Sequence, residues 1–237
     1  MKKIIIIAAF SITTVNAQFM DKVKKNIPKN LTPKAIPLTE EEIGKGLKEA
    51  LNKGIEKGVA QLSKPDGYFK DVEIKIPMPE KAKNVEEKLR KIGQGAKVDE
   101  AILSMNRAAE DAAVLAKDLF VTAVKNMTIS DAKTILKGEK NAATQYLQKS
   151  TSTALTEKFK PIIKTSLDKV GATKHWETVF STYNKIPLVE KVNPNLEEYV
   201  TEKAINGLFI QVAKEELQIR ENPTARVTDL LKKVFGK

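Results

Sequence analysis

The stretch from Val98 to Met127 contains no glycine and no proline. Its apolar residues recur at alternating spacings of four and three, which places them along one face of a helix. This alanine seam consists of Val98, Ile102, Met105, Ala109, Ala112, Ala116, Leu119 and Ala123. Further apolar residues lie off the seam, so the apolar surface is wider than the roughly 100° stripe of a surface helix. The pattern predicts an uninterrupted central helix about 45 Å long, and hence an all-α bundle packed around residues 98–127.

Residues 1–17 have the three parts of a secretory signal peptide. Lys2 and Lys3 precede the apolar run 4–10, and the small-residue site Val15-Asn16-Ala17 follows. The alternative is a membrane anchor, but residues 4–15 are too few for a span of about 20 residues. We therefore expect cleavage near Ala17 and a periplasmic or secreted mature protein.

The chain has no cysteine, which excludes disulfides, thiolate metal ligands, cysteine nucleophiles and a lipid-modified cysteine at the cleavage site. Loss of Lys2 and Lys3 lowers the formal net charge from +11 to +9. A basic chain favours anionic partners such as a membrane surface or envelope polymers. Export argues against nucleic acid, and solvated helix faces are the other explanation of the charge.

Residues 18–38 carry five lysines, at positions 22, 24, 25, 29 and 34, and three prolines, at 28, 33 and 37. Proline lacks a backbone donor and disfavours helix, so we predict a basic linker without a packed helix. The linker serves either as an electrostatic tether to an anionic membrane or as a plain spacer. The helical domain then occupies residues 39–237.

Thr39 and Glu42 have the spacing of a capping box, and apolar residues at helical spacing continue to Leu62. Gly54 and Gly58 lie one turn apart in this predicted helix, where each costs about 1 kcal/mol relative to alanine. We predict that the two glycines offset this cost by packing closely against the alanine seam. Contact with a ligand is the alternative.

A turn at Pro65-Asp66-Gly67 ends that helix. Residues 72–76 alternate like a strand, but Pro77 and Pro79 follow and no partner strand is evident, so we predict one short extended strap. A helix is expected over 80–92, with Ile92 facing inward and Gly93 at its end.

The remaining signals predict five more helices and no solenoid repeat. Thr128 and Asp131 cap a helix that ends at Gly138. The next, residues 141–170, is expected to break at Ser150–Thr153 or at Pro161. The last three are expected over 175–186, from about Asn195 to about residue 220, and after Asn222. The helix after Asn222 is basic and amphipathic, and it either docks on the bundle or lies on a membrane.

Motifs for catalysis are missing from the sequence. His175 is the only histidine, so a two-histidine metal site is excluded. Neither a glycine-rich phosphate loop nor a Gly-x-Ser-x-Gly elbow occurs. We predict no catalytic residue, no metal site and no cofactor, and the sequence sets no oligomeric state.

One polar cluster lies in the middle of the predicted central helix, namely Asn106, Arg107 and Glu110. Spacings of three and four let these side chains reach one another. If they face inward they need polar partners. They are our candidate binding residues, and a bridge that fixes the register of the bundle is the alternative.

Four segments resemble an exported bacterial all-helical family catalogued as a domain of unknown function. They are Lys64–Gly67, Met105–Glu110, Ala142–Tyr146 and Thr228–Gly236. The resemblance runs from Ile43 to Gly236. It implies export and a single helical domain, and it implies no activity, cofactor or catalytic residue.

These observations favour a non-catalytic exported envelope protein that binds a protein partner, or an apolar or anionic ligand, between its helices. Carboxylates are abundant, so an envelope hydrolase acting through them is one alternative. A peripheral protein of the membrane surface is the other.

Overall fold

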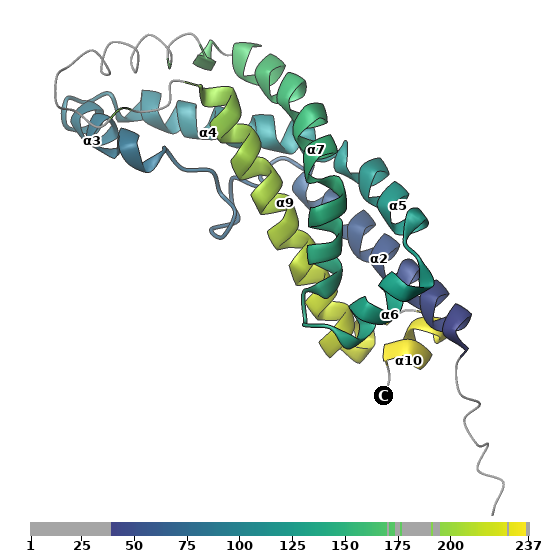
Figure 1. The fold of residues 1–237 in the computed structure, drawn as a ribbon. Helices are drawn as coiled ribbons and strands as arrows, with labels where there is room; N and C mark the ends of the chain where they lie inside the picture. Colours follow the sequence, from purple (N-terminus) through teal and green to yellow (C-terminus); the bar gives the residue numbers. More distant parts are fainter. Residues whose placement is uncertain are drawn as a thin grey trace, which may run out of the picture. The chain divides into compact units, whose positions relative to one another are not determined.

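The computed structural model describes residues 39–169, 171–173, 176, 191, 195–226 and 228–235. Within this part of the chain the regular elements are all helical, which confirms the predicted all-α bundle. The predicted signal peptide, the basic linker and the helix expected over 175–186 lie outside the described residues. Figure 1 shows the helices: α2 (Glu40–Leu62), η1 (Glu80–Ala82), α3 (Lys83–Lys91), α4 (Gly95–Ala113), α5 (Ala116–Asn126), α6 (Ile129–Lys137), α7 (Ala142–Lys169), α9 (Leu196–Glu221), η2 (Pro223–Ala225) and α10 (Asp229–Phe235).

The expected central helix is two helices, because Val114 and Leu115 separate α4 from α5. The Leu115 N–H bonds to the Ala112 carbonyl at 3.1 Å, which makes a tight turn instead of a continued α-helix. Neither glycine nor proline marks this break. The packing changes across it: α4 lies mainly on α7, α9 and α3 with few contacts to α2, whereas α5 lies on α2 and α7. The central part of the alanine seam is buried as predicted, while Val114 is 58% exposed.

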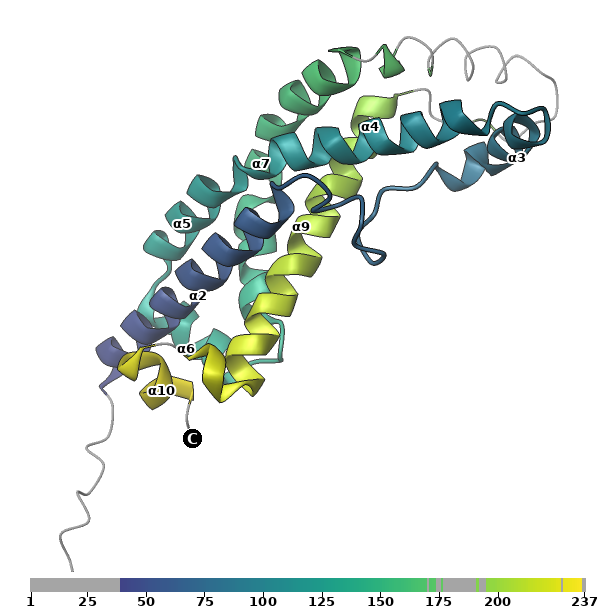
Figure 2. The same ribbon diagram turned by 180° about the vertical axis from the view of Figure 1, so that it is seen from behind.

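Helix α2 begins with the predicted capping box, in which the Thr39 side chain accepts from the Glu42 N–H. The prediction for its glycines was wrong in one respect. Gly54 and Gly58 face α9, not the alanine seam, and ideal Cβ atoms placed on them would lie 3.4 Å from Glu215 and Gln211. The close approach that the glycines permit therefore joins α2 to α9, as Figure 2 shows from behind.

Residues 63–79 form the α2–α3 connection, which contains turns and irregular backbone and no helix. The predicted strap differs over residues 72–74, which form a turn, while residues 75–79 have no regular secondary structure. Ile74 and Ile76 are buried, whereas Val72 is 97% exposed. The helix predicted to follow is present as η1 and α3, and Gly93 after it has a φ of +79°. Ile92, expected to face inward, is exposed.

Helix α6 begins at the predicted Thr128–Asp131 capping box. Helix α7 runs unbroken from Ala142 to Lys169, so the break expected at Ser150–Thr153 or Pro161 is absent. The hydroxyl groups in this region donate back to carbonyl groups of the preceding turn, as Thr151 does to Leu147 at 2.6 Å, and so fit within the helix. Pro161 lies on the exposed side, where water can serve the carbonyl group that its ring leaves unpaired.

Helix α9 is capped by Asn195, whose side chain accepts from the Glu198 N–H. It packs on α7, α2 and α4 and lies beside both α2 and α7. The terminal helix α10 docks on α2, where Val234 and Leu230 lie over Gly46. Arg226 is buried, and its guanidinium donates to the Ile219 and Arg220 carbonyls at the end of α9.

The core lies where α2, α4, α5, α7 and α9 meet. Its large side chains come from every one of these helices, so no helix buries its apolar face alone. The rings of Phe120 from α5 and Phe209 from α9 pack with centroids 5.7 Å apart. Tyr68, from the α2–α3 connection, is also fully buried in this core. The connection is therefore an internal part of the fold, and it shapes the surface beside α9.

Candidate binding site

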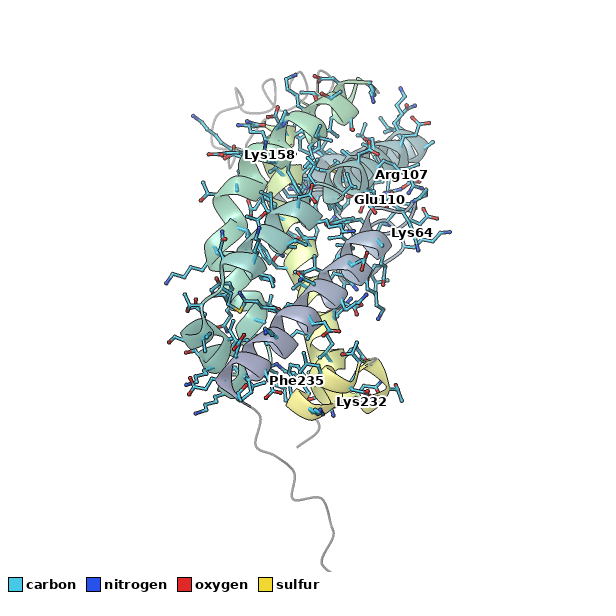
Figure 3. The ribbon with its side chains drawn as sticks, turned by 90° about the vertical axis from the view of Figure 1, so that its right-hand side faces the viewer. Lys64, Arg107, Glu110, Lys158, Lys232 and Phe235 are labelled. Atoms are coloured by element: carbon cyan, nitrogen blue, oxygen red, sulfur yellow. The ribbon has the colours of Figure 1, made fainter. Side chains whose placement is uncertain are left out.

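The predicted polar cluster lies on α4 and faces the α2–α3 connection. Glu110 is buried, and one of its oxygens accepts from the Tyr68 and Phe69 N–H groups at 3.0 and 3.2 Å. Its other oxygen accepts from Arg107 Nη1 at 2.5 Å, and Arg107 Nη2 donates to Asp66 at 2.7 Å. Figure 3 shows Arg107 and Glu110 on the same side of the molecule as Lys64, which precedes this turn.

Asn106 performs a separate task one turn earlier on α4. Its side-chain oxygen accepts from the Ile76 N–H and its nitrogen donates to the Ile76 carbonyl, both at 2.9 Å. The same nitrogen also donates to the Ile102 carbonyl at 2.7 Å. The structure therefore brings Arg107 and Glu110 together, as expected, but Asn106 hydrogen-bonds to neither of them. All three side chains hold backbone or turn residues of the connection.

Asp66 is the strained residue of this turn, with a φ of +71°. Asparagine and aspartate tolerate this left-handed region better than other non-glycine residues. Hydrogen bonds from Lys70 and then Arg107 lower the pKa of Asp66, so the carboxylate is charged at neutral pH. Gly67 follows, where a side chain would meet the Gln61 and Leu62 carbonyls. The Pro-Asp-Gly turn is thus fixed by ion pairs on one side and by close backbone packing on the other.

Tyr68 anchors the middle of the connection between α4 and α9. Its hydroxyl donates to the Ala204 carbonyl at 2.8 Å, and its ring lies against Gly207, where an ideal Cβ would be 2.7 Å from the ring. Burial raises the pKa of the Tyr68 hydroxyl, and the Glu110 charge adds to the effect, so the hydroxyl remains a donor. Lys214 of α9 pairs with Asp71 at 3.2 Å farther along the connection.

A groove of about 520 Å³ lies between residues 73–81 and the first half of α9. Its apolar lining comes from both segments: Ile74, Pro77, Met78, Pro79, Tyr199, Gly207 and Ile210. Its charged lining has four carboxylates, Glu73, Glu80, Glu198 and Glu202, and three lysines, Lys75, Lys81 and Lys203. One of these cations is turned away, since Lys75 Nζ lies 4.3 Å from the centroid of the Phe69 ring, which does not line the groove.

Tyr199 connects the two walls of this groove. Its hydroxyl donates to the Pro77 carbonyl at 2.9 Å, and the ammonium of Lys203 lies 5.8 Å from the centroid of its ring. Burial, followed by the charges of Glu80 and Glu202, raises the pKa of Tyr199 to about 12. Two carboxylates of the lining therefore lie close enough to act on this hydroxyl, and the ring already accepts a cation on its face.

Two other buried carboxylates hold helices together. Glu216 of α9 accepts from the Ala143 and Thr144 N–H groups at the start of α7, at 3.0 and 2.8 Å. A carboxylate is favoured there because it satisfies unpaired N–H groups and opposes the helix dipole. Its partner Arg220 donates to the Ile135 carbonyl near the end of α6. Glu215 binds Lys57 of α2 at 2.8 Å.

Sequence reasoning found the α4 cluster but missed the groove, Tyr68, Tyr199, Glu215 and Glu216. A signal for Tyr199 was present, because Glu202 and Lys203 follow it at helical spacings of three and four. Among the described residues, no group of three metal-ligating side chains is arranged to hold an ion. No helix in the described part of the chain is both long and apolar enough to cross a membrane.

Comparison with known proteins gives the family. No curated protein and no solved structure matches the chain. One family, described as "Protein of unknown function (DUF4197)", matches residues 37–236, which include all the helices described above. The chain belongs to this DUF4197 family.

Proposed function

We propose that this protein is a non-catalytic binding protein of the cell envelope, and that its groove holds a segment of a protein partner. The observation that carries the proposal is the construction of the groove. Side-chain hydrogen bonds from α4 and α9 hold the backbone of Ile76 and Pro77 in one wall, so the groove is formed before a partner arrives. A preformed groove does not lose ordering entropy on binding, which favours affinity.

The state of the buried carboxylates supports binding over hydrolysis. Glu110 accepts three hydrogen bonds, two from backbone and one from Arg107. Glu215 and Glu216 pair with Lys57 and Arg220 and also accept further hydrogen bonds. A general acid or base needs free access to substrate, whereas these groups are engaged in holding the fold.

The lining of the groove favours a protein segment over the other expected ligands. The lining has four carboxylates and only three lysines, and Lys75 is turned away over the Phe69 ring, so an anionic ligand gains little there. The apolar residues line an open groove between a loop segment and a helix, which suits side chains presented by an extended or helical peptide. A protein partner is therefore the occupant that the groove supports best.

Site-specific photo-crosslinking tests the proposal in the cells that produce the protein. A benzophenone amino acid replaces Asn206, an exposed residue of the groove, and in a matched variant it replaces Glu157, an exposed residue of α7. We expect a discrete adduct from position 206 and none from position 157. Equal adducts from both positions, or none from either, would refute the proposal. Turnover of envelope polymers or esters by the purified protein would instead support a hydrolase.

The envelope location rests on residues 1–17, with their charged, apolar and small-residue parts. Cell fractionation and N-terminal sequencing of the mature protein test it. We expect the sequence to begin at Gln18, and recovery of an intact Met1 in the cytoplasm would exclude export.

A second function, peripheral association with an anionic membrane, is favoured by the five lysines of residues 18–38, which oppose the single acid Asp21. Each well-placed lysine contributes on the order of 1 kcal/mol at low salt. We expect a chain beginning at Gln18 to cosediment with anionic vesicles at low salt, and one beginning at Thr39 to remain in solution. Equal, salt-independent binding of both chains would show that the linker is no tether.

A further inference from the structure

The groove has a local feature that distinguishes one class of protein segment from others. The Tyr199 ring is partly exposed within it, and Glu80 and Glu202 of the lining are close enough to act on its hydroxyl. The chain's own Lys203 places its ammonium over this ring. An aromatic face beside carboxylates is a recognition element for cations.

The carboxylates that line the groove differ in whether a lysine already pairs with them. Glu80 is paired with Lys83 at 2.6 Å and Glu73 with Lys214 at 2.8 Å. Glu202 is exposed and has no hydrogen bond or ion pair within the described residues. Lys203 is held over the ring by a weak interaction at 5.8 Å, which an incoming cation can replace at little cost.

We infer that the groove binds a segment carrying a lysine or arginine, whose cation lies over the Tyr199 ring beside Glu202. This inference rests on the proposed function, since it assumes that the groove is the binding site. In the bound state the incoming cation displaces Lys203 from the ring, and the side chains next to it in the segment contact Met78 and Ile210.

Two neighbouring substitutions test the inference with opposite expected signs. Glu202→Gln removes the attracting charge, and Lys203→Gln removes the competing one, without a large change in size. Glu157→Gln on α7 makes the same chemical change as Glu202→Gln at an exposed residue outside the groove. All three variants should fold as the parent does, since two of the positions are exposed and Lys203 is only partly buried.

The probe is a phage-displayed library of random peptides selected on the purified mature protein, followed by fluorescence anisotropy with synthetic copies of the enriched peptides. We expect enriched peptides to contain lysine or arginine. Glu202→Gln should weaken their binding about fivefold at low salt, Lys203→Gln should strengthen it about threefold, and Glu157→Gln should leave it unchanged. Asn206→Trp, which fills the groove, should abolish binding.

The outcomes separate this inference from the proposed function. Enriched peptides that lack basic residues, or that bind Glu202→Gln and Lys203→Gln as tightly as the parent, would show that cation recognition is wrong. If Asn206→Trp still blocks these peptides, the groove remains the binding site. If no peptide is enriched, or Asn206→Trp has no effect, both the inference and the groove as binding site are overturned.

Discussion

Replacing Asn106 by leucine tests how much of the stability depends on the clamp between α4 and the α2–α3 connection. Asn106 is fully buried and bonds to both the N–H and the carbonyl group of Ile76. Leucine is similar in size, so the change creates no large cavity. It leaves two buried backbone groups without partners, and each costs about 1–3 kcal/mol. Partial relaxation and the gain from burying leucine reduce the sum, so we expect a loss of about 3 kcal/mol in the free energy of unfolding.

Urea denaturation followed by far-ultraviolet circular dichroism measures this loss. Asn84→Leu is the matched control, because Asn84 is an exposed helical asparagine on α3 and surface changes usually stay within about 0.5 kcal/mol. Asn106→Asp should also destabilise the protein, since it places an oxygen against the Ile76 and Ile102 carbonyls. If Asn106→Leu costs no more than Asn84→Leu, the clamp does not stabilise the fold and the reasoning is refuted.

Three further substitutions test other contacts by thermal or urea unfolding. Gly207→Ala should destabilise by about 1–3 kcal/mol, because its Cβ would lie 2.7 Å from the Tyr68 ring; an unchanged midpoint would mean that the ring moves freely. Ala112→Leu should cost a similar amount, about 1–3 kcal/mol, by overpacking a fully buried position; a neutral result would contradict a close-packed seam. The Thr128 N–H and hydroxyl lower the pKa of Asp131, so its contribution to stability is present above its ordinary pKa and is lost as pH falls through the lowered value. Asp131→Asn should therefore flatten the acid side of the curve of Tm against pH, and an unaltered curve would exclude this cap as a source of acid sensitivity.

The elements that the sequence predicted well are those whose signals are local. The two capping boxes and the helix ends at Gly93 and Gly138 each depend on residues within one turn of chain. The break at Val114 was not predictable in this way, because it has no local signal and lies where the packing changes from mainly α7, α9 and α3 to α2 and α7. The continuity of α7 was missed for the opposite reason, because local signals suggested a break. Hydrogen bonds from the hydroxyl groups to carbonyl groups of the preceding turn, and the exposure of Pro161, reduce the cost of continuing the helix through these residues.

The candidate site shows the same division. Polar residues inside an apolar helix predicted that Asn106 and Glu110 need partners, and both are buried and fully engaged. Their partners, backbone groups of Ile76 and Tyr68, lie 30 and 42 residues away and carry no side-chain signature. The groove could not be predicted because it forms between segments that meet only in the folded chain. The partner of the Gly54 face was assigned to the wrong helix because small residues show that a close approach occurs, but not which helix makes it.

The contact of Gly54 and Gly58 with α9 also bears on how the domain is synthesised. Helix α2 leaves the ribosome first among the described helices, and α9 leaves after the other long ones. Until α9 emerges, the glycine face of α2 has no partner, and glycine is a poor helix former without one. The domain therefore closes late, by joining segments about 150 residues apart, as the Lys57–Glu215 pair with its separation of 158 residues illustrates. A nascent chain stalled before Leu196 would expose this face to chaperones.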